Sequence, residues 1–306
     1  MNHYIIETEA LSRHFGAVKA VDGLGLGVLP GCVYGFLGPN GAGKTTTIRM
    51  LLGLIRADAG EIRLFGRSLR EEGVQVFHRI GSLVESPSLY PHLTGWENLE
   101  LLRLMVGGKR SQIEYALQVV NMQDAARRLV REYSLGMRQR LGLALALFGD
   151  PELLILDEPT NGLDPAGIHE MRALISRLPH EGITVFLSSH LLSEVEQVAT
   201  HIGIIHAGRL IFQGTPDELR ARYQDYATIT TDRLEASRQL LVQSGWQAAH
   251  LENHHLSVPV NGPSDAAMIN AQLVKAGHQV FQLGLVQPSL EDIFLTLTNN
   301  ASYGGL

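Results

Sequence analysis

The stretch from residue 32 to residue 55, CVYGFLGPNGAGKTTTIRMLLGLI, decides the fold of this chain. It begins with an apolar run that predicts a buried strand, and a glycine-rich loop follows. Past the loop, the apolar residues Ile48, Leu51, Leu52 and Ile55 recur at helical spacing. The sequence therefore predicts a strand, a loop and a helix in direct succession.

The loop itself, residues 38–45, fits the phosphate-binding pattern G-x-x-x-x-G-K-[ST]. Its glycines allow backbone N–H groups to wrap around the β- and γ-phosphates, Lys44 supplies a cation, and Thr45 offers a hydroxyl to Mg²⁺. A flexible turn with an exposed lysine is the alternative, and the flanking strand and helix argue against it. We expect these residues to contact ATP: Gly38, Pro39, Asn40, Gly41, Ala42, Gly43, Lys44, Thr45 and Thr46.

A second apolar run, LLILDEP at residues 153–159, ends in two neighbouring carboxylates. Asp157 at the end of this predicted strand is placed to hold the metal, and Glu158 directly after it is placed to polarise the attacking water. A helix cap or a turn is the alternative for an aspartate at a strand end. Because a phosphate-binding loop is present in the same chain, we expect Asp157 to bind Mg²⁺ and Glu158 to be catalytic.

Length, composition and charge limit the class of protein. With 306 residues, of which 45% are apolar and 18% charged, the chain has the composition of a globular protein of about two domains. Its net charge of −6 offers no broad basic field, so we expect no nucleic-acid partner. A single cysteine, the absence of a signal-peptide pattern, and apolar runs far shorter than the ~20 residues of a membrane span predict a cytosolic protein.

The order of the predicted elements indicates two domains. Strand patterns extend up to residue 222 and are interrupted by a pattern that reads as helical throughout from about residue 96 to 148. We expect an α/β domain over 1–222 with a helical subdomain at about 86–150. After residue 223 the order is strand, helix, two strands, helix, strand, helix, which predicts a small α+β domain over 223–306.

Together these motifs resemble the ATP-binding subunit of an ABC transporter, and further segments follow the order of that family's motifs. Residues 133–137, YSLGM, resemble the family's signature segment, and residues 161–164, NGLD, resemble its D-loop. The resemblance implies that Ser134 and Gly136 complete the nucleotide site of a second subunit, and that Asp164 belongs to the nucleotide site as well. An ordinary helix N-cap is the alternative for Ser134.

Two more residues owe their expected roles to the resemblance. His190, 32 residues after Glu158, resembles the switch histidine that contacts the γ-phosphate, and we expect it to be catalytic together with Glu158 and Lys44. Phe15, 29 residues before Lys44, occupies the position of the aromatic residue that stacks on adenine. A structural histidine and a core phenylalanine are the alternatives.

One position departs from the family pattern. Glu85 stands where the family usually has a glutamine, and residues 80–99 around it resemble the acidic variant of bacitracin-resistance and lantibiotic-immunity exporters. The segment PSLEDIFLTLT at 288–298 resembles the tail of drug-exporter ATPases. We expect Glu85 to take part in binding the nucleotide and Mg²⁺, and a solvated loop carboxylate is the alternative.

The resemblance implies hydrolysis of ATP with Mg²⁺, at two sites shared between two ATPase subunits that form a homodimer or a pair of different chains. Separate transmembrane permease subunits are the implied partners, which places the protein on the inner face of the cell membrane as part of an exporter for a peptide antibiotic or another drug-like substrate. A soluble regulatory ATPase with a non-transport partner is the alternative. We expect residues 86–106 to contact the permease, although Trp96 fits the core of the helical subdomain equally well.

Overall fold

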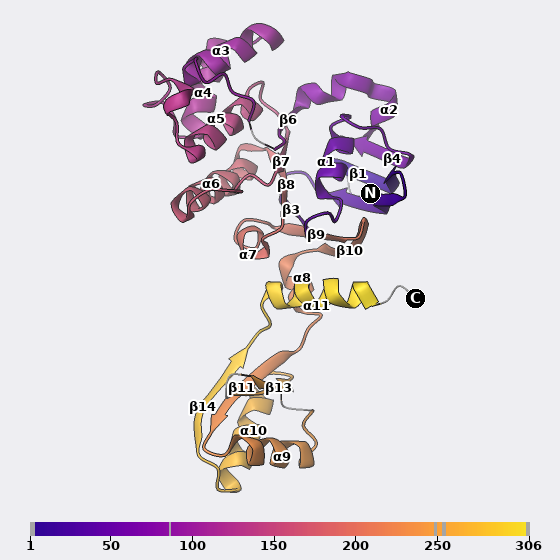
Figure 1. Cartoon of the computed structure of the whole chain (residues 1–306), viewed down its shortest axis with the longest axis vertical. Helices are drawn as coiled ribbons and strands as arrows, with labels where there is room; N and C mark the ends of the chain where they lie inside the picture. The colour runs from indigo at the N-terminus through magenta and orange to yellow at the C-terminus, as the bar shows by residue number, and fades with distance from the viewer. Residues whose placement is uncertain (1–3, 86, 248–249, 253–254, 304–306) are drawn as a thin grey trace. The chain divides into compact units, whose positions relative to one another are not determined.

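The computed structural model describes residues 4–85, 87–247, 250–252 and 255–303. Its internal contacts divide the chain into two compact units, with the division between Pro216 and Asp217. Figure 1 shows the helices and strands of both units with their labels. We describe each unit by itself, and the first unit contains every nucleotide motif of the sequence.

An antiparallel sheet opens the first unit. Its strand order is β2-β1-β4-β5, with β1 at Ile6–Phe15, β2 at Val18–Val28, β4 at Ala59–Leu64 and β5 at Arg67–Ser68. Buried residues such as Ile6, Leu11 and Leu24 lie on the inner face. β1 and β2 pair as a hairpin from Ile6 opposite Val28 to Phe15 opposite Val18.

A six-stranded, mostly parallel sheet follows, in the order β10-β9-β3-β8-β7-β6. Its strands are β3 at Val33–Leu37, β6 at Ile80–Leu83, β7 at Leu153–Asp157, β8 at Thr184–Ser189, β9 at His201–His206 and β10 at Arg209–Gly214. Strands β3, β7 and β8 are buried along their whole length, as the continuous apolar runs predict for strands covered on both faces. The parallel register places Leu37 opposite Ser189 and Asp157 opposite Ser188, so the carboxyl ends of these three strands meet at one edge.

The helix after the phosphate-binding loop, α1 at Lys44–Leu51, shares one hydrophobic core with both sheets. Ile48 and Leu51 pack with residues such as Leu24 of the antiparallel sheet and Phe36 of the six-stranded sheet. The rings of Tyr34 and Phe186 stack in this core, 5.5 Å apart between centroids. Burial on both sides therefore fixes the start of α1, and with it the loop that precedes it.

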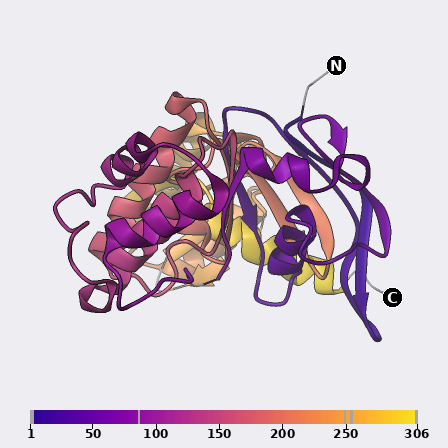
Figure 2. The same ribbon diagram turned by 90° about the horizontal axis from the view of Figure 1, so that it is seen from above.

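Three helices form the segment between β6 and β7: α3 at Gly95–Val106, α4 at Arg110–Val119 and α5 at Leu135–Leu147. Figures 1 and 2 show them on the opposite side of the six-stranded sheet from the antiparallel sheet. The expectation of helix throughout 96–148 is wrong for residues 107–109, between α3 and α4, and for the longer stretch 120–134. There the chain forms turns and one short 3₁₀ helix, η2 at Val130–Glu132, because Ser134 caps α5 with its side chain and ends the irregular stretch.

Shorter or peripheral helices complete this part of the chain. A capped helix follows the two carboxylates, because the Asp164 side chain accepts a hydrogen bond from the backbone N–H of Gly167 and Pro165 stands at the first helical position. The helices are α2 at Leu69–Glu72, η1 at Gly73–Arg79, α6 at Pro165–Arg177, η3 at Leu178–Glu181 and α7 at Leu192–Val195. The helix α8 at Pro216–Arg220 begins at the last residue of the first unit and continues into the second.

The second unit has a four-stranded antiparallel sheet in the order β12-β13-β11-β14, with two helices packed on it. Its elements are β11 at Asp225–Thr231, α9 at Leu234–Gln243, β12 at His250–Glu252, β13 at His255–Val260, α10 at Pro263–Lys275, β14 at Val280–Val286 and α11 at Leu290–Tyr303. This is the element order that the sequence predicts. Of the strand predicted at 246–252, residues 248–249 lie outside the described residues.

Candidate functional site

The phosphate-binding loop connects the end of β3 to the start of α1. Gly43 is the N-cap of α1 with φ 109°, and a Cβ atom there would lie 2.3 Å from the carbonyl oxygen of Ala20. A Cβ atom on Gly38 would lie 2.4 Å from the carbonyl oxygen of Ile205. Both positions therefore require glycine, and the loop backbone stays open for an anion at the N-terminus of α1.

Lys44 is the cation of this site. Its side chain is 6% exposed, and its Nζ donates a hydrogen bond to the carbonyl oxygen of Gly38 at 2.8 Å. The same Nζ lies 3.2 Å from Oε1 of Glu158. The ammonium group is therefore held between the phosphate-binding loop and the carboxylate that follows β7, where a phosphate group can reach it.

The two carboxylates after the apolar strand β7 occupy different environments. Asp157 is 4% exposed, and the Ser188 hydroxyl donates to its Oδ1 at 2.5 Å. The backbone N–H of Glu158 donates to the same Ser188 oxygen at 3.0 Å, and Glu158 has a left-handed backbone with φ 50°. The bend turns the Glu158 side chain toward His190, whose Nδ1 lies 2.7 Å from Oε2 of Glu158.

A cavity of about 420 Å³ lies where these residues meet. It is lined by Val18, Ala20, Asn40, Gly41, Gly43, Lys44, Thr45, Thr46, Glu158, Asn161 and His190. The structure thus brings the loop residues expected from the sequence together with Glu158 and His190, although more than a hundred residues separate them in the chain. Asp157 is tied to this group through Ser188. Pro39 and Ala42 shape the loop, because the Ala42 N–H donates to the Pro39 carbonyl oxygen at 3.1 Å.

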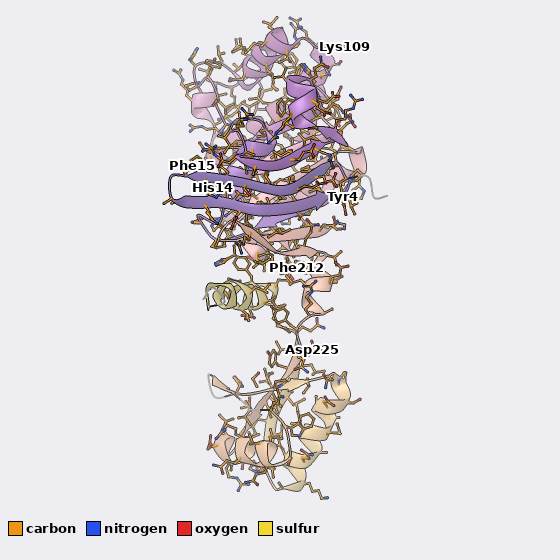
Figure 3. The ribbon with its side chains drawn as sticks, turned by 90° about the vertical axis from the view of Figure 1, so that its right-hand side faces the viewer. Tyr4, His14, Phe15, Lys109, Phe212 and Asp225 are labelled. Atoms are coloured by element: carbon orange, nitrogen blue, oxygen red, sulfur yellow. The ribbon has the colours of Figure 1, made fainter. Side chains whose placement is uncertain are left out.

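Phe15 is the last residue of β1 and pairs with Val18, the first residue of β2. Figure 3 shows Phe15 beside His14 at one end of the antiparallel sheet. The side chain is 48% exposed, so it is not a core phenylalanine. The Arg13 guanidinium lies 4.8 Å from the centroid of the Phe15 ring and donates a hydrogen bond to Asp58 at 2.6 Å. The bond to Asp58 holds the guanidinium against one face of the ring.

The signature-like segment lies next to the D-loop-like segment rather than in the cavity. Ser134 is the N-cap of α5 and accepts a hydrogen bond from the N–H of Met137 at 3.2 Å. A Cβ atom on Gly162 would meet the Leu135 side chain at 3.2 Å, and one on Gly136 would meet Leu163 at 3.9 Å. Ser134, Gly136 and Asp164 are absent from the cavity lining given by the described residues, where Asp164 instead caps α6.

Glu85 lies two residues after β6 and forms an ion pair with Arg49 of α1. Its side chain is 63% exposed and its backbone is left-handed, with φ 60°. It does not line the cavity described above. In this conformation the carboxylate that the sequence analysis expected near the nucleotide and Mg²⁺ is bound to a guanidinium on the helix that follows the loop.

The sequence analysis missed three residues of this neighbourhood. Ser188 holds both Asp157 and the backbone of Glu158, and its only sequence signal was a hydroxyl residue at the end of the β8 strand, two positions before His190. Arg49 pairs with Glu85, but no local pattern connects residues 36 positions apart. Asn161 lines the cavity although the sequence analysis quoted it only as part of a loop.

A phosphate-binding loop between a parallel strand and a helix, with a carboxylate pair on a neighbouring strand, defines a nucleoside-triphosphate hydrolase. The family pattern described as "ABC transporter" matches residues 21–161, and that described as "ATP-binding protein DrrA1-3-like, C-terminal domain" matches residues 214–298. The chain belongs to the ATP-binding subunits of ABC transporters.

Individual relatives agree with this family. The bacitracin transport ATP-binding protein BcrA of Bacillus licheniformis is 42% identical over 309 residues, covering 98% of this chain and 99% of the relative. The lantibiotic transport ATP-binding protein SrtF of Streptococcus pyogenes is 40% identical, covering 68% of this chain and 90% of the relative. A solved structure of an ATP-binding subunit of an ABC transporter is 29% identical with a TM-score of 0.64, covering 71% of this chain and 92% of that one.

The family sets the activity. The chain is an ATPase subunit that binds ATP and hydrolyses it to drive transport, and subunits of this family dimerise and work with a permease. In the part of the chain that the structure describes, no helix combines the length and the hydropathy needed to cross a membrane.

Proposed function

We propose that this chain powers an exporter of peptide antibiotics of the bacitracin or lantibiotic type. The observation that carries the proposal is the cavity in which Glu158 contacts both Lys44 and His190 beside the phosphate-binding loop. Support for the substrate class comes from the relatives, because the bacitracin transport protein matches this chain over nearly its whole length.

The residues around the cavity divide the work of hydrolysis. Lys44 and the loop N–H groups bind the β- and γ-phosphates, and Glu158 accepts a hydrogen bond from the attacking water. The water oxygen bonds to the γ-phosphorus while the bond from that phosphorus to the β–γ bridging oxygen breaks, so ADP leaves with the bridging oxygen. The water's proton passes to the phosphate or to solvent. The Nδ1 of His190 lies 2.7 Å from Oε2 of Glu158, and His190 lines the cavity, where it would contact the γ-phosphate.

The donor groups present here fit Mg²⁺. Asp157 supplies a buried carboxylate that the Ser188 hydroxyl holds in place, and Thr45 supplies a hydroxyl at the cavity wall. A hard cation that keeps several waters needs few protein ligands, all of them oxygens, and this set meets that requirement. When bound, Mg²⁺ neutralises charge on the phosphates, and Thr45 and Asp157 would hold it. Glu85 would join them only after leaving Arg49.

A second subunit completes the nucleotide site in this proposal. Ser134 presents a hydroxyl and Gly136 a backbone N–H at the N-terminus of α5, where the helix dipole favours an anion. These groups lie outside the cavity of their own chain, so they serve the γ-phosphate held by the other subunit. By capping α6, Asp164 holds the end of the D-loop-like segment, residues 161–164, in place. Phe15 offers an exposed ring for adenine.

The permease contact that we propose is a groove of about 700 Å³ beside α3. Its wall includes Tyr90, Asn98, Leu102, Met105, Val106 and Phe148, and Tyr90, Met105 and Val106 are exposed. A groove of this size with exposed apolar side chains on its wall could accept one helical turn of a partner. Trp96 is not part of its lining, and its ring faces the Arg127 guanidinium at 5.4 Å. Through this contact the chain would sit at the cytoplasmic face of the membrane.

The test combines a cell assay with a binding assay. The chain and the permease encoded beside it are expressed in a sensitive host, and the bacitracin and lantibiotic concentrations that stop growth are measured. Wild type should raise at least one of them, Glu158→Gln should abolish the gain, and Glu114→Gln, an exposed carboxylate on α4, should leave it unchanged. Resistance that survives Glu158→Gln, or no resistance to either peptide class, contradicts the proposal. ATP titration of the purified chain tests nucleotide binding separately.

A further inference from the structure

Strand β14 forms one edge of the sheet in the second unit. It pairs with β11 from Val286 opposite Tyr226 to Val280 opposite Thr231, and no strand among the described residues pairs with its other side. Its sequence, VFQLGLV, contains neither a charged residue nor a proline. A seven-residue edge without charge or proline is a ready template for pairing with another strand.

The opposite edge of the same sheet is built differently. Among the described residues, strand β12 covers His250–Glu252 and includes an acid. A charge on an edge strand is a usual means by which proteins prevent unwanted strand pairing. One edge of this sheet thus carries such protection and the other does not.

Exposed apolar side chains accompany the open edge. Phe281 and Leu285 of β14 are 65% and 42% exposed. The register opposite Ala227 places Leu285 on the face that carries the helices, and Phe281 lies at the register shift between Gln282 and Val280. Val274 of α10, which packs beside β14, is 57% exposed. Val274 lies on the opposite side of α10 from Gln272, whose side-chain oxygen accepts a hydrogen bond from Trp246. We call Val274, Phe281, Leu285 and the outer backbone of β14 the β14 edge surface.

We propose that the β14 edge surface pairs with the same surface of a second copy of this chain, strand against strand and antiparallel. Two four-stranded sheets would then form one sheet across the dimer. Two features favour a second copy as the occupant. An uncharged strand meets its own copy without repulsion between like charges, and antiparallel self-pairing closes as a two-fold dimer, whereas other pairings leave edges open.

The proposal extends the pairing of ATPase subunits, but it does not rest on ATP. A two-fold axis through Leu283, the centre of β14, would place Phe281 of one copy opposite Leu285 of the other. The exposed side chains of Phe281 and Leu285 in the two copies would then cover one another. In the proposed nucleotide site, by contrast, contact between the two subunits depends on bound ATP, so the two contacts can be measured independently.

Cysteine crosslinking of the full chain tests the pairing. Single cysteines are placed in turn at positions 280–286, and the sole native cysteine, Cys32, is buried, so wild type gives the background. Without nucleotide, crosslinking between copies should peak at one position near Leu283 and fall to background within about two residues on either side, since equivalent residues diverge by ~6.6 Å per step. Equal crosslinking at all positions, or none above wild type, overturns the proposal.

Charge variants of the full chain give a second readout. In nucleotide-free sedimentation, Phe281→Lys with Leu285→Lys should weaken self-association roughly tenfold or more, while Phe281→Lys with Leu285→Glu should restore it to within about threefold. Val242→Lys, an exposed apolar position on α9, is the matched control and should behave as wild type. Unchanged self-association of the double-lysine variant overturns the proposal, as does a wild type that stays monomeric at about 100 µM. Persistence of the pairing in Lys44→Ala separates it from nucleotide binding.

Discussion

At the scale of single residues, the site depends on a chain of contacts rather than on isolated side chains. Ser188 holds Asp157 and the backbone of Glu158, Glu158 contacts both Lys44 and His190, and Lys44 contacts the loop carbonyls. The left-handed backbone of Glu158 is a strained conformation that the bond to Ser188 stabilises. Removing one member of this group should therefore affect its neighbours.

The Glu158→Gln substitution should preserve ATP binding and remove turnover. The amide can still accept a hydrogen bond from water, but it cannot polarise water as a carboxylate does, so we expect the rate of hydrolysis to fall by roughly 10²-fold or more. ATP titration and phosphate release measure the two properties. A dimer that accumulates with ATP in sizing experiments is the further expected result. Lys44→Ala is the control that should lose nucleotide binding itself, and turnover near the wild-type rate in Glu158→Gln would contradict the assignment.

Glu85 gives a second prediction at this scale. Glu85→Gln and Arg49→Gln each break an ion pair whose partners are both largely exposed, so we expect a stability change below about 1 kcal/mol and nearly unchanged ATP affinity. The coupling between hydrolysis and transport should change in Glu85→Gln. This substitution removes the negative charge by which the loop differs from the glutamine that is usual in the family. ATPase rate and resistance in cells are compared for both variants. Wild-type values in both assays for Glu85→Gln and Glu85→Ala would support a solvated loop carboxylate instead.

At the scale of elements, close packing of a strand against a helix holds the helical segment on the sheet. A Cβ atom on Gly81 of β6 would lie 1.9 Å from the carbonyl oxygen of Ala146 in α5. Backbone atoms cannot move aside as a flexible side chain can, so the helix must shift to admit any larger residue. Because α5 begins at Ser134, such a shift reaches the segment that we propose serves the second subunit.

Gly81→Ala should therefore lower the free energy of unfolding by about 1–3 kcal/mol through overpacking. Thermal unfolding followed by circular dichroism measures the loss. Gly25→Ala in β2 is the matched control, because the nearest atom to its added Cβ is 3.9 Å away, an ordinary contact. Equal melting temperatures for the two variants would show that α5 does not pack on β6 as described. ATP binding by the chain alone should survive in both.

At the scale of the whole molecule, the two units divide the tasks. Every residue that lines the nucleotide cavity precedes Pro216, and the β14 edge surface belongs to the second unit. Each unit has a hydrophobic core of its own, with residues such as Leu24 and Phe36 in the first and Ile229 and Leu273 in the second. Separate cores favour folding of the first unit without the second.

A chain that ends after residue 222 should fold and bind ATP with an affinity within about threefold of the full chain, since it keeps all the nucleotide motifs. Circular dichroism and ATP titration measure folding and binding. Self-association without nucleotide should be lost at the same time, because β14 is removed. A truncated chain that folds and fails to bind ATP would contradict the predicted boundary at 222/223.

Local patterns in the sequence determined much of this protein. The loop at residues 38–45 is recognisable from its own pattern, because its glycines, Lys44 and Thr45 stand at the spacing of a phosphate-binding loop. The apolar run before Asp157 specified a buried strand, and the element order after residue 223 agrees with the structure. Such features depend on neighbours within a few residues, so one-dimensional periodicity reports them.

Tertiary structure alone decided which distant residues meet. The parallel register of β3, β7 and β8 brings Ser188 to Asp157, and the approach of the β6 loop to α1 pairs Glu85 with Arg49. The exposed edge at β14 likewise follows from the strand order β12-β13-β11-β14. Strand order and register arise from burial summed over the whole core, which no short window of sequence contains. The sequence therefore determined the chemistry of the site, and the packing of the sheets decided which residues share it.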